Sequence, residues 1–416
     1  MRSSARRAVV DLPAPAPVLA CAPPAPDAAL APTGGLLALG LAGLCAFLNV
    51  YATQPLLPLL GKVFAASKAQ AALTVSAPSI AVALAAPFVG AVADRVGRRR
   101  MMVGALFVLA VPTFLAATAG SISALVAWRF VQGLAVPGVY AVGVAYAGEE
   151  WRGRGVGQAM AALVTGNVVG GFLGRAVAGL VAEHAGWRAS FVALGLLTAA
   201  GALATARWLP PARRSAAAAS RPVAALRALA AHVREPRLAA TFLVGFDVLF
   251  VQVATFTYVT FYLAEPPFHL GAGALSGIFV VYLAGAAVTP FAGRWIDRAG
   301  SRRTLAVALA AGVAGSALTL SHGLPVVVLG LALSCSAAFV SQSAATSYLP
   351  LAAPPEVRSV ASGVYLSCYY LGGAAGGLLP VFAWRAGGWP ACVALVVAVQ
   401  LATIAVALRA WRGDRR

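Results

Sequence analysis

Charged side chains are scarce in this sequence. They make up 10% of its 416 residues and only 12 residues are acidic, whereas 61% are hydrophobic. Soluble domains carry charge on about a quarter of their residues, so this composition excludes an ordinary soluble fold. Apolar runs recur from Gly34 almost to the end, each of about 20 residues, which is long enough to cross ~30 Å of hydrocarbon. The sequence therefore predicts an all-α polytopic membrane protein.

The motifs of several enzyme and pump classes are also missing. The four histidines are scattered, and no HExxH or paired-carboxylate pattern occurs, which argues against a membrane enzyme and against a metal or cofactor. The absence of a GxxxxGK[ST] loop excludes an ATP-driven pump within this chain. A non-transporting sensor would need a sizeable soluble output domain, which is not present. The arginines are not gathered with aromatics in a basic domain, so nucleic acid is not an expected partner.

Twelve apolar runs can be counted between charged or Pro/Gly-marked breaks. In the first half they lie near 34–54, 72–93, 101–119, 122–148, 158–182 and 189–209, and in the second near 238–264, 274–293, 304–320, 324–348, 361–384 and 391–409. The predicted division is a disordered Pro/Ala-rich tail (1–33), a six-helix half (34–209), a basic linker (210–237), a second six-helix half (238–410) and a short tail (411–416).

Basic residues concentrate on one side of this arrangement. Arginines fill alternate loops, at 95–100, 152–154, 294–303 and 358, and the segment 210–237 that falls on the same side. Lysine and arginine in short loops are retained in the cytoplasm. Both termini are therefore expected to be cytoplasmic, in the inner membrane of a bacterium.

The stretch GAVADRVGRRR, which begins at Gly90, returns as GRWIDRAGSRR at Gly293. Gly90 would permit close helix approach, and Gly97 an unusual turn. Asp94 could pair with arginines or face a helix dipole in one conformation and lose that contact in another. The alternative is a plain basic turn, which leaves the acid unexplained.

GAVADRVGRR resembles the signature loop of the major facilitator superfamily, Gly-x-x-x-Asp-Arg-x-Gly-Arg-Arg, and the resemblance extends from about Gly34 to Arg409. It implies two pseudo-symmetric six-helix halves and a conformational switch at both loops. The switch residues are Gly90, Asp94, Arg95, Gly97 and Arg98, with Gly293, Asp297, Arg298 and Gly300 in the second copy, where Ser301 replaces the first basic residue after the glycine.

Further strings are similar to motifs of the same superfamily. WRFVQGLAV, with Arg129 and Gln132, resembles a motif of proton-coupled members. TGNVVGGFLGR resembles an exporter motif, with Arg175 as a departure from it. NVYATQPLLPLL and YVTFYL look like the bacterial YnfM-type branch of drug or sugar efflux permeases. Glycines at four-residue steps indicate close helix packing: Gly166, Gly170, Gly174, Gly372 and Gly376.

Asp247 is the one acid that falls well inside a span. A carboxylate there is costly unless it is paired or protonated, so a functional role is the default hypothesis. Asp247 shares a helical face with Tyr258 and Tyr262, which predicts a cavity-lining stripe. Asp247 is predicted to carry the proton, and the alternative is a hydrogen-bonded structural acid.

Two arginines, Arg129 and Arg175, fall inside spans of the first half, where no acid can neutralise them. They could snorkel, bind backbone carbonyls, pair with Asp247, or bind an anionic substrate. The polar residues around them complete the predicted substrate site: Asn49, Tyr51 and Gln54 on the first span, and Gln132 and Tyr140 beside Arg129. The first span has no acid, which argues against cationic drugs, although Asn and Gln also serve as packing residues.

The leading interpretation is a monomeric secondary transporter with a cavity that opens alternately to each side. Its partners are a small neutral or anionic molecule, protons and the lipid bilayer. The resemblance implies proton-coupled efflux, in which protonation of Asp247 trades against substrate binding near Arg129. An uptake permease of the same fold is the first alternative.

Overall fold

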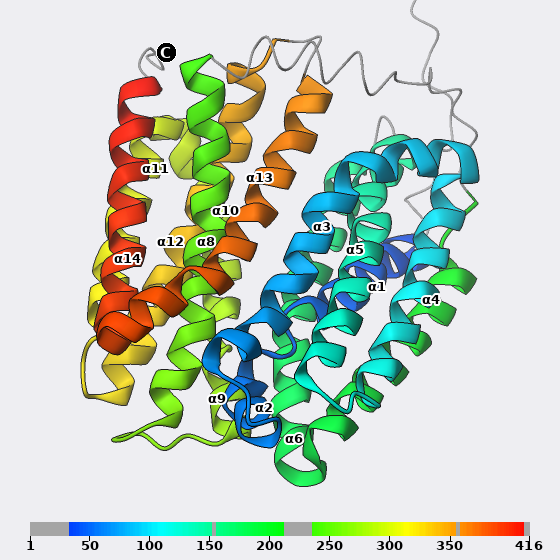
Figure 1. Cartoon of the computed structure of the whole chain (residues 1–416). Helices are drawn as coiled ribbons and strands as arrows, with labels where there is room; N and C mark the ends of the chain where they lie inside the picture. Colours follow the sequence, from blue (N-terminus) through cyan, green and yellow to red (C-terminus); the bar gives the residue numbers. More distant parts are fainter. Residues whose placement is uncertain (1–32, 152–154, 212–234, 355–357, 412–416) are drawn as a thin grey trace, which may run out of the picture.

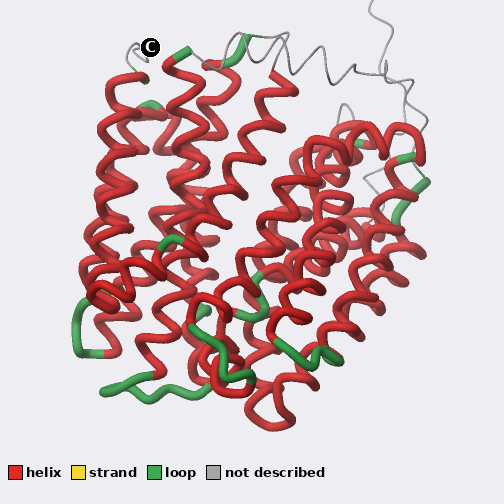
Figure 2. Tube along the Cα trace, viewed as in Figure 1, coloured by secondary structure: helices red, strands yellow, loops and turns green. Residues whose placement is uncertain are grey.

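The computed structural model describes residues 33–151, 155–211, 235–354 and 358–411, and they form helices joined by short loops (Figure 2). No β-strand occurs within these ranges. The expected tails and the expected basic linker lie almost entirely outside the described residues.

Six spans belong to each half of the chain. The first half contains α1 (Thr33–Val50), η1 (Gln54–Leu56), α2 (Leu57–Val63), α3 (Lys68–Val96), α4 (Arg98–Ala116), α5 (Ile122–Glu150) and α6 (Val156–Trp208). The second contains α8 (Pro236–Ala264), α9 (Ala272–Ile278), α10 (Val281–Ala299), α11 (Ser301–Leu318), α12 (Leu324–Ala352), α13 (Arg358–Leu378) and α14 (Pro380–Ala410).

Nine helical segments in the described ranges are long and apolar enough to cross a membrane. One of them, α6, holds two spans, because Gly186 adopts a φ of 82° and interrupts the helix. The helices α11 and α13, of 18 and 21 residues, complete the set of twelve. The predicted all-helical polytopic fold is confirmed.

Local sequence explains where several helices begin and end. Ser67 caps α3 in a reciprocal capping box with Gln70, and Ser121 accepts a hydrogen bond from the backbone of α5. These caps satisfy backbone N–H groups that have no partner inside the helix. Gly97 and Gly300 end α3 and α10 with φ of 93° and 78°, a region that other L-residues rarely adopt. The unusual turn expected at Gly97 is thus present.

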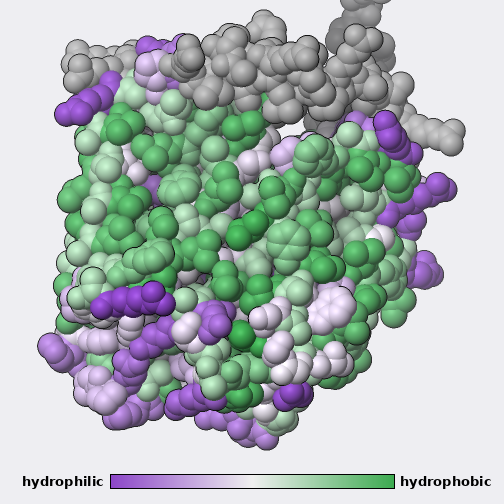
Figure 3. Space-filling model, in the orientation of Figure 1, coloured by the Kyte–Doolittle hydropathy of each residue, from purple (hydrophilic) through white to green (hydrophobic). Residues whose placement is uncertain are grey.

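The two halves lie side by side, the first from blue to green and the second from green to red (Figure 1). They meet where α3 packs on α13, and where α6 packs on α9 and α10. Hydrophobic side chains cover the middle of the visible face, and hydrophilic ones gather at its lower edge (Figure 3). Large apolar side chains such as Phe88, Leu203 and Phe382 are more than half exposed, as lipid-facing residues are.

Glycine lets the first and fifth spans of each half touch through their backbones. A Cβ on Gly170 would overlap the carbonyl oxygen of Leu44 on α1, and a Cβ on Gly372 would overlap that of Phe246 on α8. The same contact repeats one turn along: Gly166 on Gly40, Gly174 on Leu48, and Gly376 on Phe250. The packing role of all five predicted glycines agrees with these contacts.

A second contact also repeats in both halves. Arg99 donates to the carbonyls of Ala206 at 2.6 Å and Leu209 at 2.7 Å, at the end of α6. Arg302 donates to the carbonyl of Leu408 at 2.8 and 3.2 Å, near the end of α14. Each arginine lies two residues after the glycine that ends the preceding helix. A cation at a helix C-terminus satisfies carbonyls that lack partners and favours the dipole, so these arginine clasps tie the third span to the sixth in each half.

Candidate functional site

A cavity of about 130 Å³ lies between the two halves. Eight lining residues come from the first half: Phe47, Tyr51, Tyr140, Val164, Asn167, Val168, Gly171 and Arg175. Eight come from the second: Leu249, Gln252, Tyr282, Phe339, Gln342, Leu366, Tyr369 and Tyr370. Seven of these side chains are aromatic, three are amides, and Arg175 is the one charged group among them.

Arg175 is held firmly in the wall of this cavity. Its side chain is 2% exposed. Nε donates to Gln54 Oε1 at 2.7 Å, and Nη1 donates to the Gly171 carbonyl one turn earlier on α6 at 2.5 Å. Nη2 has no hydrogen-bond partner among the described residues. The guanidinium is therefore fixed in position while part of its donor capacity stays unused.

Aromatic rings surround the Arg175 guanidinium. Its central carbon lies 5.0 Å from the ring centroid of Tyr51, 4.9 Å from Phe279 and 4.4 Å from Tyr282. Cations are attracted to ring faces within about 6 Å. These contacts explain how a cation is tolerated there, because none of the described residues forms an ion pair with Arg175.

Gln54 connects Arg175 to the other half. Its Oε1 accepts from Arg175, and its Nε2 donates to Thr257 Oγ1 of α8 at 3.2 Å. All three side chains are buried. Hydrogen bonds in such surroundings are costly to leave unmade. A change at Arg175 therefore alters a contact between the halves.

Arg129 also lies inside the membrane span but not on the cavity. It is fully buried, and it donates to the carbonyls of Thr74 at 3.0 Å and Asn49 at 2.6 Å, as well as to Val50 and Gln132. The helix α1 ends at Val50, where carbonyls lack intrahelical partners. Arg129 therefore caps the break after α1. Of the alternatives left open by the sequence, the structure shows the contact with backbone carbonyls.

The predicted polar residues Asn49 and Gln132 support this cap. Asn49 donates to Thr198 Oγ1 at 2.9 Å and accepts from Thr113 Oγ1 at 3.1 Å. Gln132 donates to the same Thr113 hydroxyl at 2.8 Å. Neither lines the cavity, so packing and positioning explain their presence.

Asp247 lies outside the cavity as well. It is 1% exposed on the side of α8 that meets α14, with Thr403 beside it. No ion pair to Asp247 is formed within the described ranges, and its Oδ1 has no hydrogen-bond partner there. The position is 11 residues into α8, about 16 Å from the helix end at 1.5 Å per residue. An acid without an ion pair among the described residues thus lies well inside a helix that is long and apolar enough to cross a membrane.

Tyr258 and Tyr262, which were expected to line the cavity together with Asp247, lie elsewhere. Tyr258 donates to the Gly377 carbonyl at 3.0 Å, and Tyr262 stacks on Trp389 with ring centroids 5.7 Å apart. Neither tyrosine lines the cavity. The prediction of a cavity-lining stripe was therefore wrong. The three residues do share a side of α8, but Leu249 and Gln252 form the side that faces the cavity.

The halves are joined by charge at the lower end in Figure 1. Lys68, at the start of α3, lies 2.7 Å from Glu265 at the end of α8, and its ammonium lies 4.4 Å from the ring centroid of Trp384 on α14. We call these three residues the Lys68 latch. The hydrogen bond from Gln54 to Thr257 also joins the halves, and so do the contacts of Arg175 with the rings of Phe279 and Tyr282.

The two signature loops differ in their acids. Arg98 lies 3.5 Å from Asp94 and 2.6 Å from Glu149 at the end of α5, so the first loop forms a charge network. Asp297 of the second loop is exposed and forms no ion pair within the described ranges. Ser301 stands where Arg98 would be, which removes the cation that would pair with Asp297.

The remaining loop residues make few contacts. Arg95 and Arg298 are exposed. A Cβ on Gly90 or Gly293 would meet nothing within 4 Å. The close helix approach expected at Gly90 is therefore absent from this conformation, and that expectation was wrong for it.

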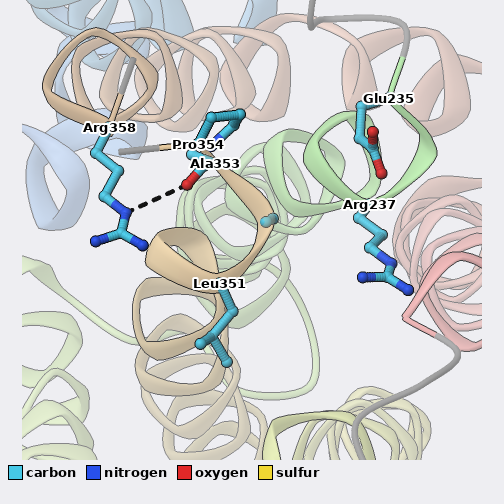
Figure 4. A pocket seen from close by; sticks show the side chains of 7 residues that line it. Glu235, Arg237, Leu351, Ala353, Pro354 and Arg358 are labelled. Carbon is cyan, nitrogen blue, oxygen red and sulfur yellow. Dashed lines mark hydrogen bonds between the residues drawn. The ribbon is translucent and has the colours of Figure 1, made fainter. Parts of the chain in front are cut away.

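A second, polar pocket lies where α8 and α13 begin (Figure 4). Glu235, Arg237 and Arg358 line it, and Arg358 Nε donates to the Ala353 carbonyl at 3.2 Å. Its lining residues Glu235, Pro354 and Arg358 adjoin, in the sequence, segments that lie outside the described residues, so the pocket supports no functional assignment.

Sequence reasoning missed most of the cavity wall, since Tyr51, Tyr140 and Arg175 are the predicted site residues among its 16 lining residues. Gln252 and Gln342 are polar residues inside apolar spans, which is the signal that could have found them. The aromatic residues Phe279 and Tyr282 carry no such signal, because aromatics are common in membrane helices. The ion pair from Lys68 to Glu265 joins residues 197 positions apart, and only the fold brings them together.

Comparison with known proteins agrees with this architecture. A family model described as Major Facilitator Superfamily matches residues 39–411. The inner membrane transport protein YnfM of Escherichia coli is 29% identical over 376 residues, covering 90% of each chain. The solved structure of a point mutant of the nucleoside transporter NupG has a TM-score of 0.75 at 16% identity and covers 91% of this chain and 100% of its own. The human organic anion transporter MFSD10 has a TM-score of 0.68 at 22% identity and covers 90% and 99%.

Proposed function

Because the chain belongs to the major facilitator superfamily and is thus a multi-pass membrane transporter, we propose that its substrate is a small neutral or anionic molecule. The observation behind this proposal is the cavity between the halves, where Arg175 is the one charged lining residue. An acid-free wall with a fixed arginine repels organic cations and attracts anions. The two solved relatives are named for different substrate classes, a nucleoside and an organic anion, so the choice rests on the cavity.

Transport would proceed by alternating access, with one half rocking against the other around the cavity. In this proposal the end with the basic loops, the upper end in Figure 1, faces the cytoplasm by the positive-inside rule. Both termini would then be cytoplasmic. The Lys68 latch would then close the periplasmic end. The loop network of Asp94, Arg98 and Glu149 would lie at the cytoplasmic end and change during the cycle.

The proposed direction is proton-coupled efflux. No cation of the described residues forms an ion pair with Asp247, so its neutral, protonated form is the one that tolerates burial. The same helix, α8, lines the cavity through Leu249 and Gln252 and bonds to Gln54 through Thr257. Loss of the proton from Asp247 would therefore act on the helix that touches the substrate. Uptake by the same fold is the alternative, since the direction depends on this coupling.

Everted membrane vesicles that contain the protein would test the proposal. After energisation, the internal pH is followed with a fluorescent reporter while neutral, anionic and cationic compounds are added. We expect anionic or neutral compounds to dissipate the gradient with wild type but not with Asp247→Asn, whereas the exposed-acid control Asp297→Asn should respond as wild type does.

Three results would contradict parts of the proposal. An equal response of Asp247→Asn and wild type would place the proton site elsewhere. A response to cations alone would refute the substrate charge. Accumulation of substrate by right-side-out vesicles, driven by an inward proton gradient, would show uptake in place of efflux.

A further inference from the structure

We propose that the substrate is a monocarboxylate that carries one flat, unsaturated ring, with its carboxylate on Arg175 and its ring against the tyrosines of the cavity. This inference rests on the proposed transport function and narrows the substrate to one chemical class. Three observations support it: the unused donors of Arg175, the balance of charge in the cavity, and the shape and aromatic content of its wall.

The donors of Arg175 are the first observation. A guanidinium has five N–H groups, and the described residues take two of them, one on Nε and one on Nη1. Five minus two leaves three, which include both hydrogens of Nη2. Arg175 lines the cavity, and Gln54 and Gly171 hold it in place. Parallel N–H groups on one edge of a guanidinium match the two oxygens of a carboxylate.

The charge balance is the second observation. The cavity wall contains one cation and, within the described residues, no acid. One carboxylate would neutralise Arg175, and the loaded cavity would be electrically neutral while it is closed from water. A dianion would leave one negative charge uncompensated, and a neutral molecule would leave the positive charge of Arg175 uncompensated. Uncompensated charge at this depth is costly, so a monoanion fits best.

The wall of the cavity is the third observation. Tyr51 and Tyr282 contribute ring faces beside Arg175, and Tyr140, Tyr369 and Tyr370 continue the aromatic surface. Flat rings stack on such surfaces or meet them edge to face. The cavity volume of about 130 Å³ is close to the roughly 150 Å³ of an engineered cavity that binds benzene. One ring with small substituents therefore fills it, and the amides can bond polar substituents.

Calorimetric titration of the full chain in lipid nanodiscs would test this class directly. Four probes separate the three observations: benzoate, butyrate without a ring, neutral benzamide, and the dianion phthalate. We expect benzoate to bind at least about tenfold more tightly than each of the others, since charge-assisted pairing and ring contact each contribute to the free energy of binding.

Variants provide matched controls. Arg175→Gln should weaken benzoate binding at least about tenfold. Arg188→Gln is the matched control, because Arg188 also donates to a carbonyl, that of Ala119, and lies over a ring, that of Trp187. It should leave benzoate binding unchanged, since Arg188 is exposed just after the break in α6 at Gly186 and does not line the cavity. Tyr282→Leu should weaken benzoate and leave butyrate unchanged. The four-probe series on wild type decides the proposal even if a variant fails to fold.

Each contrary result removes the proposal. If butyrate binds as tightly as benzoate, the cavity does not recognise a ring. If benzamide binds as tightly as benzoate, it does not recognise a negative charge, and if phthalate does, it does not select a single charge. No binding by any probe would exclude the class. If such a failure occurs while the vesicle assay shows transport of another compound, the transport function stands and this class alone is refuted. If benzoate binds through Arg175 but no compound moves in the vesicles, the failure is that of the proposed transport.

Discussion

Removal of the Lys68 side chain should open the end of the molecule that the latch closes. The side chains of Lys68 and Glu265 are 33% and 51% exposed, so their ion pair contributes about 0.2–1 kcal/mol. The contact of Lys68 with Trp384 at 4.4 Å adds about 0.5–1 kcal/mol at such a site. Together the latch stabilises the closed conformation by about 1–2 kcal/mol, and Lys68→Ala should lower the closed-to-open ratio about 5- to 30-fold.

Distances between spin labels at this end would measure that ratio. The labels would be placed on exposed residues of the two halves, at His184→Cys and His322→Cys, after replacement of the native cysteines. Lys68→Ala should enlarge the long-distance population, and the control Lys62→Ala, which removes an exposed lysine that forms no ion pair within the described ranges, should not.

The charge-swapped double variant Lys68→Glu with Glu265→Lys separates the two contributions. It restores the ion pair but not the contact with Trp384, so its closed population should fall between those of wild type and Lys68→Ala. A distance distribution for Lys68→Ala that matches wild type would refute the reasoning, because the closed end would then be held by apolar packing alone.

Three further predictions concern stability and the loops. Gly170→Leu should prevent the close packing of α1 and α6 and lower the thermal stability in detergent by several degrees or abolish folding, whereas Gly148→Ala, at a position with open space, should leave it unchanged. Arg129→Met should lower the free energy of unfolding by about 2–5 kcal/mol, measured by denaturant titration, because it leaves buried carbonyls unpaired; a smaller loss would show that water replaces the cap. Arg98→Gln should alter the rate of transport in the vesicle assay because it unpairs two acids, while Asp297→Asn should not, and equal effects would contradict the difference between the loops.

The membrane spans could be predicted from the sequence alone, but the side of each helix that faces the cavity could not. Asp247, Tyr258 and Leu249 all lie on α8, and successive residues turn by about 100°. Tyr258, eleven residues on, lies about 20° from Asp247, so the shared face was predictable. Which face meets the cavity depends on how α8 packs against α13 and α14, and no local pattern reports that.

The two membrane arginines show the same limit in the candidate site. Arg129 and Arg175 carry the same signal in the sequence, since each is a cation in an apolar span without an acid nearby, and the motif around Arg129 favoured it for proton coupling. The difference arises from what lies opposite them. Arg129 contacts the C-terminal end of α1, where carbonyls lack intrahelical donors, whereas Arg175 contacts aromatic rings and lines the cavity. Long-range packing thus determines that Arg129 binds backbone carbonyls and that Arg175 keeps unused N–H donors at the cavity.

The arginine clasps and glycine contacts have a consequence for biosynthesis. Arg99 bonds to the end of α6, and Gly170 packs on α1, so both contacts close within residues 33–211 and neither needs the second half. A ribosome that has released α6 into the membrane has already delivered every partner these contacts require. The first half can therefore complete its internal packing while the second is still being translated, and the second half meets a finished surface.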